Sequence, residues 1–387
     1  MIKGFKIRIY PTKEQEKLIW QHIGACRFIW NYMLDLQQQR HKAGEKHLSA
    51  FDMIKLLTPL KQAEEYAWLR SVSNTSLQRT CSTLAEDYNA FFKKRSGFPK
   101  FKSRKRSKPC YPVRSERLYF VDDKYAQVEK LGRVKYKSDF EFPQGTGHKF
   151  SNVRISYVNG KYMLSFGMEC ENQAPELTDK PMGIDLGIKE LAVVACGDEQ
   201  IVFHNINKSK KVRELKRKLR YTQRTISRKY EASKKRTGTY EKTRNIEREE
   251  AKARKLYAKL TNIRHNYLHQ TTAKLISMLP KRITMEELNV SGMMKNTHLS
   301  KAVAEQCFYE FIRQVRYKCE WNGIEFVQVP RFYPSSKTCS CCGAIKRDLR
   351  LSDRTYVCQE CGFTIDRDYN AAINLMRYTD LHSQAVA

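Results

Sequence analysis

The sequence predicts a multidomain protein of the α/β class, and three observations support this prediction. Residues 2–10 and 111–170 alternate apolar with polar or basic side chains, the period of two that is typical of strands. Residues 12–96 instead repeat apolar side chains at helical spacing. From residue 181 the patterns follow the order strand, strand, strand, helix, strand, helix, strand, helix. We therefore expect a β domain, a helical bundle and an α/β domain.

The first strand ends at Pro11, and a small helical bundle should follow it. Thr12 and Gln15 form the capping-box pattern that opens a helix, and Ser49 is a candidate cap for a second helix. A third helix is predicted over about residues 74–95. These helices therefore form an insertion between the first strand and the rest of the β domain.

A basic segment and a set of strands follow the bundle. Residues 93–108 are dense in Lys and Arg, with Phe98 and Phe101 among them. Such segments can bind phosphates while the rings stack on bases, although a solvated basic loop is an equal alternative. Farther on, Asn159-Gly160 predicts a hairpin turn between two alternating stretches. We expect these strands and residues 2–10 to form a small β-barrel.

Residues 182–188 read MGIDLGI, and they place one carboxylate on an apolar strand. Alternate residues from Met182 share one face, whereas Gly183, Asp185 and Gly187 share the other. A buried charge is costly unless it is paired or holds a metal, and bare glycines would let a metal ion or a nucleic-acid backbone approach. We interpret Asp185 as the first ligand of a metal-dependent nuclease site. An edge-strand Asp that faces solvent is the alternative.

The order of elements in the second half is that of ribonuclease-H-like folds, in which the first strand, the fourth strand and the last helix bring carboxylates together. Asp185, Glu286 or Glu287, and Asp366 or Asp368 occupy those places. Three carboxylates repel one another unless cations neutralise them. Two Mg²⁺ ions about 4 Å apart would do so and would promote phosphodiester hydrolysis. Each acid also has an ordinary alternative, a helix N-cap for the two aspartates and a solvent-facing position for Glu286.

Five of the twelve cysteines lie within residues 339–361. Cys339-x-x-Cys342 and Cys358-x-x-Cys361, separated by fifteen residues, have the spacing of a zinc ribbon. Four thiolates make a closed tetrahedral site, so this Zn²⁺ is expected to be structural. The remaining thiol, Cys341, could compete for the ligand position of Cys342.

The formal charge of +31 favours a polyanionic partner. Residues 208–220 alone hold eight Lys or Arg and one Glu. A membrane surface could also attract this charge, but no apolar run is long enough to span a bilayer and no export signal is apparent. We therefore expect a protein of the prokaryotic cytoplasm or nucleoid, in which clustered cysteines bind metal rather than form disulfides.

Four stretches of the chain resemble TnpB, a family of transposon-encoded RNA-guided nucleases related to type V CRISPR effectors. They are GIDLGIK at 183–189, TMEELNV at 284–290, TCSCCG at 338–343 and CGFTIDRDYNAAINL at 361–375. The opening KGFKIRIYPTKEQ and the stretch SLQRTCSTLAEDYNAFFKK at 76–94 are similar too. The resemblance thus covers nearly the whole chain.

The resemblance implies four domains. They are a split β-barrel wedge domain at 1–11 and 97–180, a helical recognition domain at 12–96, a ribonuclease-H-like (RuvC-like) nuclease domain at 181–333 and 363–387, and a zinc-ribbon insertion at 334–362 that binds target nucleic acid. It also implies a guide RNA made from the transposon end and a double-stranded DNA target beside a short target-adjacent motif. A monomer and a dimer both remain open.

By motif, the catalytic acids and Mg²⁺ ligands of the family correspond to Asp185, Glu286 and Asp368, since the family's acid is the first of an acidic pair before Leu. Nucleic-acid contacts are expected at two groups of residues. Asn74, Thr75 and Gln78 fall where the family reads the target-adjacent motif, and the basic segments contribute Lys100, Lys102, Arg104, Lys210, Lys211 and Arg213. Two alternatives remain: a guide-directed DNA-binding regulator that does not cut, and a DNA transposase of the same fold.

Overall fold

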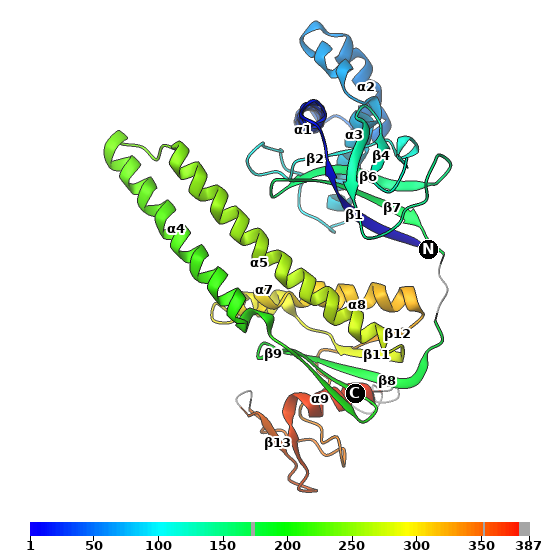
Figure 1. The fold of residues 1–387 in the computed structure, drawn as a ribbon, viewed down its shortest axis with the longest axis vertical. Coiled ribbons are helices and arrows are strands. Elements are labelled where there is room, and N and C mark those ends of the chain that lie inside the picture. Colours follow the sequence, from blue (N-terminus) through cyan, green and yellow to red (C-terminus); the bar gives the residue numbers. More distant parts are fainter. Residues whose placement is uncertain (172–174, 351–352, 379–387) are drawn as a thin grey trace. The chain divides into compact units, whose positions relative to one another are not determined.

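The computed structural model describes residues 1–171, 175–350 and 353–378, which divide into two compact units at residues 171 and 172 (Figure 1). Parts of three predicted domains, residues 172–174, 351–352 and 379–387, lie outside the described residues. The predicted boundary at residue 181 is too late, because strand β8 begins at Thr178 and pairs with a strand of the second unit.

The first unit combines a seven-stranded antiparallel sheet with three α-helices and two 3₁₀ segments. The strands are β1 (Ile2–Tyr10), β2 (Cys110–Pro112), β3 (Tyr119–Phe120), β4 (Tyr125–Val128), β5 (Gly132–Lys137), β6 (Phe150–Val158) and β7 (Lys161–Glu169). The helices are α1 (Lys13–Lys42), α2 (Ala50–Gln62) and α3 (Asn74–Phe92), with 3₁₀ segments at Glu64–Ser71 and Ser115–Arg117.

Residues 2–10 form a strand of this sheet, as the sequence predicted, and β1 lies in the middle of it. It pairs antiparallel with β5 and β7, and the strand order is β2-β6-β7-β1-β5-β4-β3. In the described residues the ladder does not close between β2 and β3, so the sheet is open where a barrel was predicted. These edge strands have three and two residues, which offer too few backbone donors and acceptors to continue the ladder.

The helices begin at the predicted caps and share one core with the sheet. Thr12 and Gln15 form the predicted capping box, and Ser49 caps α2. Helix α3 ends at Phe92 rather than at residue 95, since Lys94 adopts a positive φ of 55°. A single apolar cluster joins side chains of α1, α2 and α3 to those of the strands. The helical bundle therefore has no separate core of its own.

The second unit is built on a five-stranded sheet with the order β10-β9-β8-β11-β12. Its strands are β8 (Thr178–Leu186), β9 (Glu190–Cys196), β10 (Glu199–His204), β11 (Pro280–Glu286) and β12 (Glu325–Val329), and a small hairpin adds β13 (Thr355–Val357) and β14 (Thr364–Asp366). Its helices are α4 (Lys210–Thr237), α5 (Arg244–Ser277), α6 (Val290–Lys295), α7 (Ser300–Gln306), α8 (Phe308–Asn322) and α9 (Arg367–Met376), with a 3₁₀ segment at Ile206–Lys208.

Different helices cover the two faces of this sheet. Helices α5 and α8 pack on one face, where Met182 and Ile184 contribute to the main core. Helix α9 packs on the other face, where Ala372 and Met376 contact side chains of β9. The single helix predicted between the fourth and fifth strands of this domain is divided, because Cys307 adopts a left-handed conformation between α7 and α8.

Helices α4 and α5 form a long antiparallel hairpin that extends beyond the sheet (Figure 1). Helix α5 is continuous from Arg244 to Ser277, because Ala253, Leu256 and Leu260 pack against α4 along its first half. None of the described helices combines the length and the apolar character that crossing a membrane requires.

Candidate functional site

Asp185 and Glu286 lie at neighbouring positions on adjacent strands. Strands β8 and β11 are parallel, and their register pairs Gly183 with Thr284 and Ile184 with Met285. The next residues in this register are Asp185 and Glu286. Since Ile184 and Met285 both enter the core on the α5 side, the two acids lie on the opposite face, which α9 covers.

Gly183 allows α9 to lie directly on this face. A Cβ atom at position 183 would be 2.1 Å from the carbonyl oxygen of Ala372 and 2.3 Å from the backbone nitrogen of Met376. The interpretation that this glycine admits a metal or a nucleic-acid backbone is therefore wrong, because the space is filled by protein. Asp368 precedes Ala372 by four residues, so it lies on the same side of α9, one turn nearer Asp185.

The start of α9 distinguishes Asp366 from Asp368. The Asp366 side chain is the N-cap and accepts hydrogen bonds from the backbone N–H groups of Asp368 and Tyr369, both at 3.0 Å. The carboxylate of Asp368 instead accepts a hydrogen bond of 2.9 Å from Arg367 and lies 3.8 Å from Arg354. The capping role thus belongs to Asp366, and the carboxylate of Asp368 faces arginine side chains instead of the helix backbone.

Glu286 and Glu287 also have different surroundings. Glu286 is partly buried, and burial raises the pKa of its carboxyl group. Glu287 is exposed and lies 3.3 Å from Arg331 in a surface ion pair. The side chains of consecutive residues point to opposite sides here, and only Glu286 lies on the same side as Asp185.

The pKa of Asp185 is raised well above its ordinary value. Part of the residue remains accessible, but burial of its carboxyl group is the largest cause, followed by the charges of Asp368 and Glu286. Arg367 opposes this effect, and Asp366 adds a smaller repulsion. Such mutual repulsion is what a cation relieves, so the three acids Asp185, Glu286 and Asp368 form an electrostatic site that favours bound cations.

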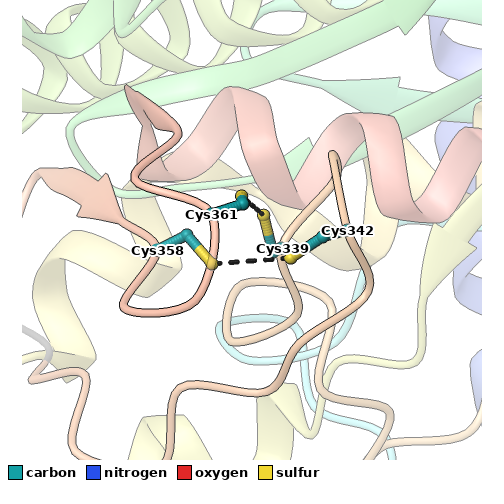
Figure 2. Close-up of side chains that lie close together, drawn as sticks. All are labelled: Cys339, Cys342, Cys358 and Cys361. Carbon is teal, nitrogen blue, oxygen red and sulfur yellow. Dashed lines mark hydrogen bonds between the residues drawn. The ribbon is translucent and has the colours of Figure 1, made fainter.

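The four predicted cysteine ligands converge at one place (Figure 2). Their sulfur atoms all lie within 4.8 Å of one another, with Cys339 and Cys361 at 3.8 Å and Cys342 and Cys358 at 3.6 Å. Each pair lies on a tight turn closed by a glycine in the left-handed region, Gly343 with φ of 80° and Gly362 with φ of 71°. The convergence of these cysteines is confirmed, and the group could hold a metal ion.

The spacing of the sulfurs fits zinc. Zn–S bonds of about 2.3 Å in a tetrahedron place neighbouring sulfurs about 3.8 Å apart. Hydrogen bonding by the backbone at Cys361 lowers the pKa of the Cys358 thiol to about 6, so that this ligand is readily ionised. The exposed Cys341 is outside the group of four, which removes it as a competitor for the place of Cys342.

The predicted nucleic-acid contacts lie on three surfaces, on which Thr75, Gln78 and Lys102 are partly buried and the other residues are exposed. The loop with Lys100, Lys102 and Arg104 is anchored to α1, because the Lys100 carbonyl accepts a hydrogen bond of 3.0 Å from the Trp30 indole and Asn31 bonds both backbone groups of Lys102. This basic segment is thus a fixed surface and not a free loop.

The other two surfaces lie at helix N-termini. Asn74, Thr75 and Gln78 lie in the first turns of α3, where Asn74 accepts a hydrogen bond from Lys61 at 2.7 Å. Lys210, Lys211 and Arg213 are exposed in the first turn of α4, which contains no acidic residue. Cations at a helix N-terminus are unfavourable for the helix dipole, so this arrangement favours an external anion.

The sequence reasoning missed two residues that position the acids. Arg282 donates a hydrogen bond of 3.3 Å to the carbonyl of Met376 and so holds the C-terminal end of α9. Arg354 approaches Asp368 from the cysteine-containing segment. Neither residue has a local signal in the sequence, because each acts on an element distant along the chain.

Three family profiles match successive parts of the chain. Their descriptions are "Helix-turn-helix domain" for residues 1–46, "Probable transposase" for residues 165–297 and "Cas12f1-like, TNB domain" for residues 308–375. In the structure residues 1–46 hold β1 and the single long helix α1. The third profile spans α8, β12, the four cysteines and α9.

A relative from Escherichia coli K12, named "Putative RNA-guided DNA endonuclease InsQ", is 31% identical over 393 residues, which span 97% of this chain and 92% of that protein. The chain belongs to the TnpB family. A second TnpB-family relative, of the same description and from Streptomyces pristinaespiralis, is 28% identical over 97% of this chain and 88% of its own length.

A solved structure of a Cas12f1–sgRNA–target DNA complex is similar to the fold of this TnpB-family chain. Its TM-score is 0.61 at 12% sequence identity, and the match covers 97% of this chain and 98% of that one. The likeness establishes that the chain has the mixed α/β fold of the Cas12f type. The family prediction made from the four motifs is therefore confirmed.

Proposed function

We propose that this chain is an RNA-guided DNA endonuclease that acts with a transposon and hydrolyses DNA at Asp185, Glu286 and Asp368. One observation supports this most strongly: the three acids are distant in sequence, yet their charges act on one another at the face of one sheet. The names of the family relatives favour the same activity. The second unit is then a RuvC-like nuclease domain, which the strand order β10-β9-β8-β11-β12 supports.

The chemistry of the donor set suits Mg²⁺, which prefers carboxylate oxygens completed by water and phosphate. Bound Mg²⁺ would supply an activated water and stabilise the leaving oxygen of the phosphodiester. Asp185 and Glu286 hold their carboxylates on rigid adjacent strands, and Asp368 approaches from α9. In the described part of the chain the three acids do not form a group as tight as the four sulfurs.

The cysteine group would stabilise the protein, and the basic surfaces would bind nucleic acid. The four cysteines would hold a structural Zn²⁺, because all four ligand positions are filled by protein. The exposed basic surfaces at Lys100–Arg104 and at the start of α4 would bind guide RNA and target DNA through phosphates. In this arrangement base pairing with the guide reads the target sequence, so the protein needs basic surfaces more than base-reading helices.

The test begins with the RNA that copurifies with the protein. That RNA is sequenced, and a plasmid with a matching target is incubated with the ribonucleoprotein and Mg²⁺. Asp185→Ala should lower the cleavage rate by at least about a thousandfold, the scale of several kcal/mol of transition-state stabilisation. Binding of the guide and target should remain nearly intact, because the basic surfaces are unchanged.

Two neighbouring acids provide matched controls. Glu287→Ala should cost little activity, because its side chain is exposed on the opposite side of the strand. Asp366→Asn keeps a side chain that can cap α9 and should also cut, whereas Asp368→Asn should not. An Asp185→Ala variant that still cuts would place the nuclease site elsewhere. Binding without cutting by the unchanged protein would instead favour a regulator, and strand joining would favour a transposase.

A further inference from the structure

The first unit contains a cavity that the nuclease chemistry does not use. It has a volume of about 240 Å³ and lies between helices α1 and α3, the loop of residues 102–109, and strands β2 and β6. Ligands of drug size occupy cavities of about 300–1,000 Å³, so this space suits a smaller group, of the order of a single nucleotide. Two of the four tryptophans of the chain, Trp20 and Trp30, line it.

The cavity is strongly basic. Among the described residues its lining contains five Lys or Arg side chains and no Asp or Glu, the cations being Arg27, Lys102, Arg104, Lys108 and Arg154. Within the described ranges none of these five cations forms an ion pair with an acidic side chain. Like charges gathered in one place repel one another, so the arrangement favours a bound anion.

Trp20 presents a fixed aromatic surface. Its indole nitrogen donates a hydrogen bond of 3.1 Å to the Tyr162 hydroxyl, and its ring packs edge-on against Tyr157 at 5.1 Å. It nevertheless remains 37% exposed. A large aromatic ring that is held on its edge but open to solvent is a preformed surface for stacking, since little side-chain entropy is lost when a second ring covers it.

Lys102 lies deeper in the same cavity. Its ammonium nitrogen is 3.1 Å from the centre of the Trp30 ring, and the Trp30 indole nitrogen is bonded to the loop backbone. Burial lowers the pKa of Lys102. An ammonium group that has lost part of its hydration gains more from a phosphate than a fully solvated one.

We propose that this cavity holds one unstacked nucleotide of the bound nucleic acid, with its base against Trp20 and its phosphate among Arg27, Lys102 and Arg104. The proposal rests on the nucleic-acid binding in the proposed function, and it adds a specific subsite to it. A duplex cannot enter a space of this size, whereas a single base can leave its stack at a cost of a few kcal/mol. Exposed basic residues on either side in the sequence continue the path for the adjoining phosphates.

The nucleotide could come from the guide RNA or from the target DNA, and the test has an arm for each. Affinity is measured for the sequenced guide RNA, and then for matching target DNA with the RNA-loaded protein. Trp20→Ala should weaken one of the two affinities at least about fivefold, the lower end of the range for base stacking on an aromatic residue. Trp20→Phe keeps a stacking ring and should stay within about threefold of the unchanged protein.

Two controls separate this site from general effects. Trp68 is 47% exposed in the same unit but does not line the cavity, so Trp68→Ala should leave both affinities unchanged. Arg104 and Arg106 are both exposed and two residues apart, yet only Arg104 lines the cavity. Arg104→Gln should therefore weaken binding severalfold more than Arg106→Gln at the same salt concentration.

A loss confined to RNA assigns the nucleotide to the guide, and a loss confined to DNA binding by the loaded protein assigns it to the target. The proposal is overturned if Trp20→Ala binds both nucleic acids as the unchanged protein does, or if the two arginine variants lose affinity equally. The arginine pair decides the matter if Trp20→Ala fails to fold. Loss of cleavage in Asp185→Ala would support the nuclease site whether or not the cavity binds a nucleotide, so the two proposals are tested independently.

Discussion

A methyl group at position 183 would enter space that the backbone of α9 already occupies. In Gly183→Ala the new Cβ would lie 2.1 Å from the Ala372 carbonyl oxygen, 2.3 Å from the Met376 nitrogen and 2.9 Å from the Met376 Cα. All three are backbone atoms, so no side-chain rotation relieves the contact. Restoring ordinary contact at 3.4 Å requires α9 to withdraw from β8 by about 1.3 Å.

Two consequences follow from that displacement. Overpacking of a core costs about 1–3 kcal/mol, and a backbone clash belongs at the upper end of this range. About 3 kcal/mol corresponds to a loss of roughly 6–12 °C in the melting temperature of a unit of this size. Because α9 carries Asp368, the proposed catalytic acid would move by a similar distance, and a misplacement of about 1 Å can cost about a hundredfold in rate.

The assay combines thermal unfolding with plasmid cleavage by the RNA-loaded protein. Gly4→Ala is the matched control, because Gly4 also lies in a strand and a Cβ there meets nothing within 4 Å. Guide-RNA binding should be unaffected in both variants. A Gly183→Ala protein that melts and cuts like the Gly4→Ala protein would refute the argument that this glycine holds α9 against the sheet.

Two further predictions concern the metal and the basic surface. Purified protein should contain about one Zn²⁺ per chain. Cys358→Ser should lower the stability of the protein, because structural zinc contributes to folding. Cys341→Ser should keep both the metal and the stability, because Cys341 is outside the group of four. Elemental analysis and thermal unfolding test this, and active protein without zinc would contradict it. The affinity for RNA should fall steeply as the salt concentration rises. Neutralising Lys210, Lys211 and Arg213 together, which are exposed at the start of α4, should reduce the slope of log affinity against log salt concentration. An unchanged slope would locate the contacts elsewhere.

The sequence alone predicted the features that are formed by residues close together in the chain. The cysteine spacing predicted four ligands at one site, because two Cys-x-x-Cys turns present their thiols irrespective of what surrounds them. The caps at Thr12 and Ser49 were likewise predicted, since a capping box is formed by residues three apart. Periodicity also predicted the strands of the second half in their order along the chain.

Contacts between distant segments were decided only by the tertiary structure. Residue types alone left Asp366 and Asp368 as alternatives until the family motif favoured Asp368, and only the structure brings the charge of Asp368 to act on Asp185. Gly183 seemed to make room for a ligand, but the space belongs to a helix almost 190 residues farther along the chain. The cavity at Trp20 joins α1 to a loop some eighty residues away. Each depends on which surfaces pack together, and no local pattern of residue types encodes that choice.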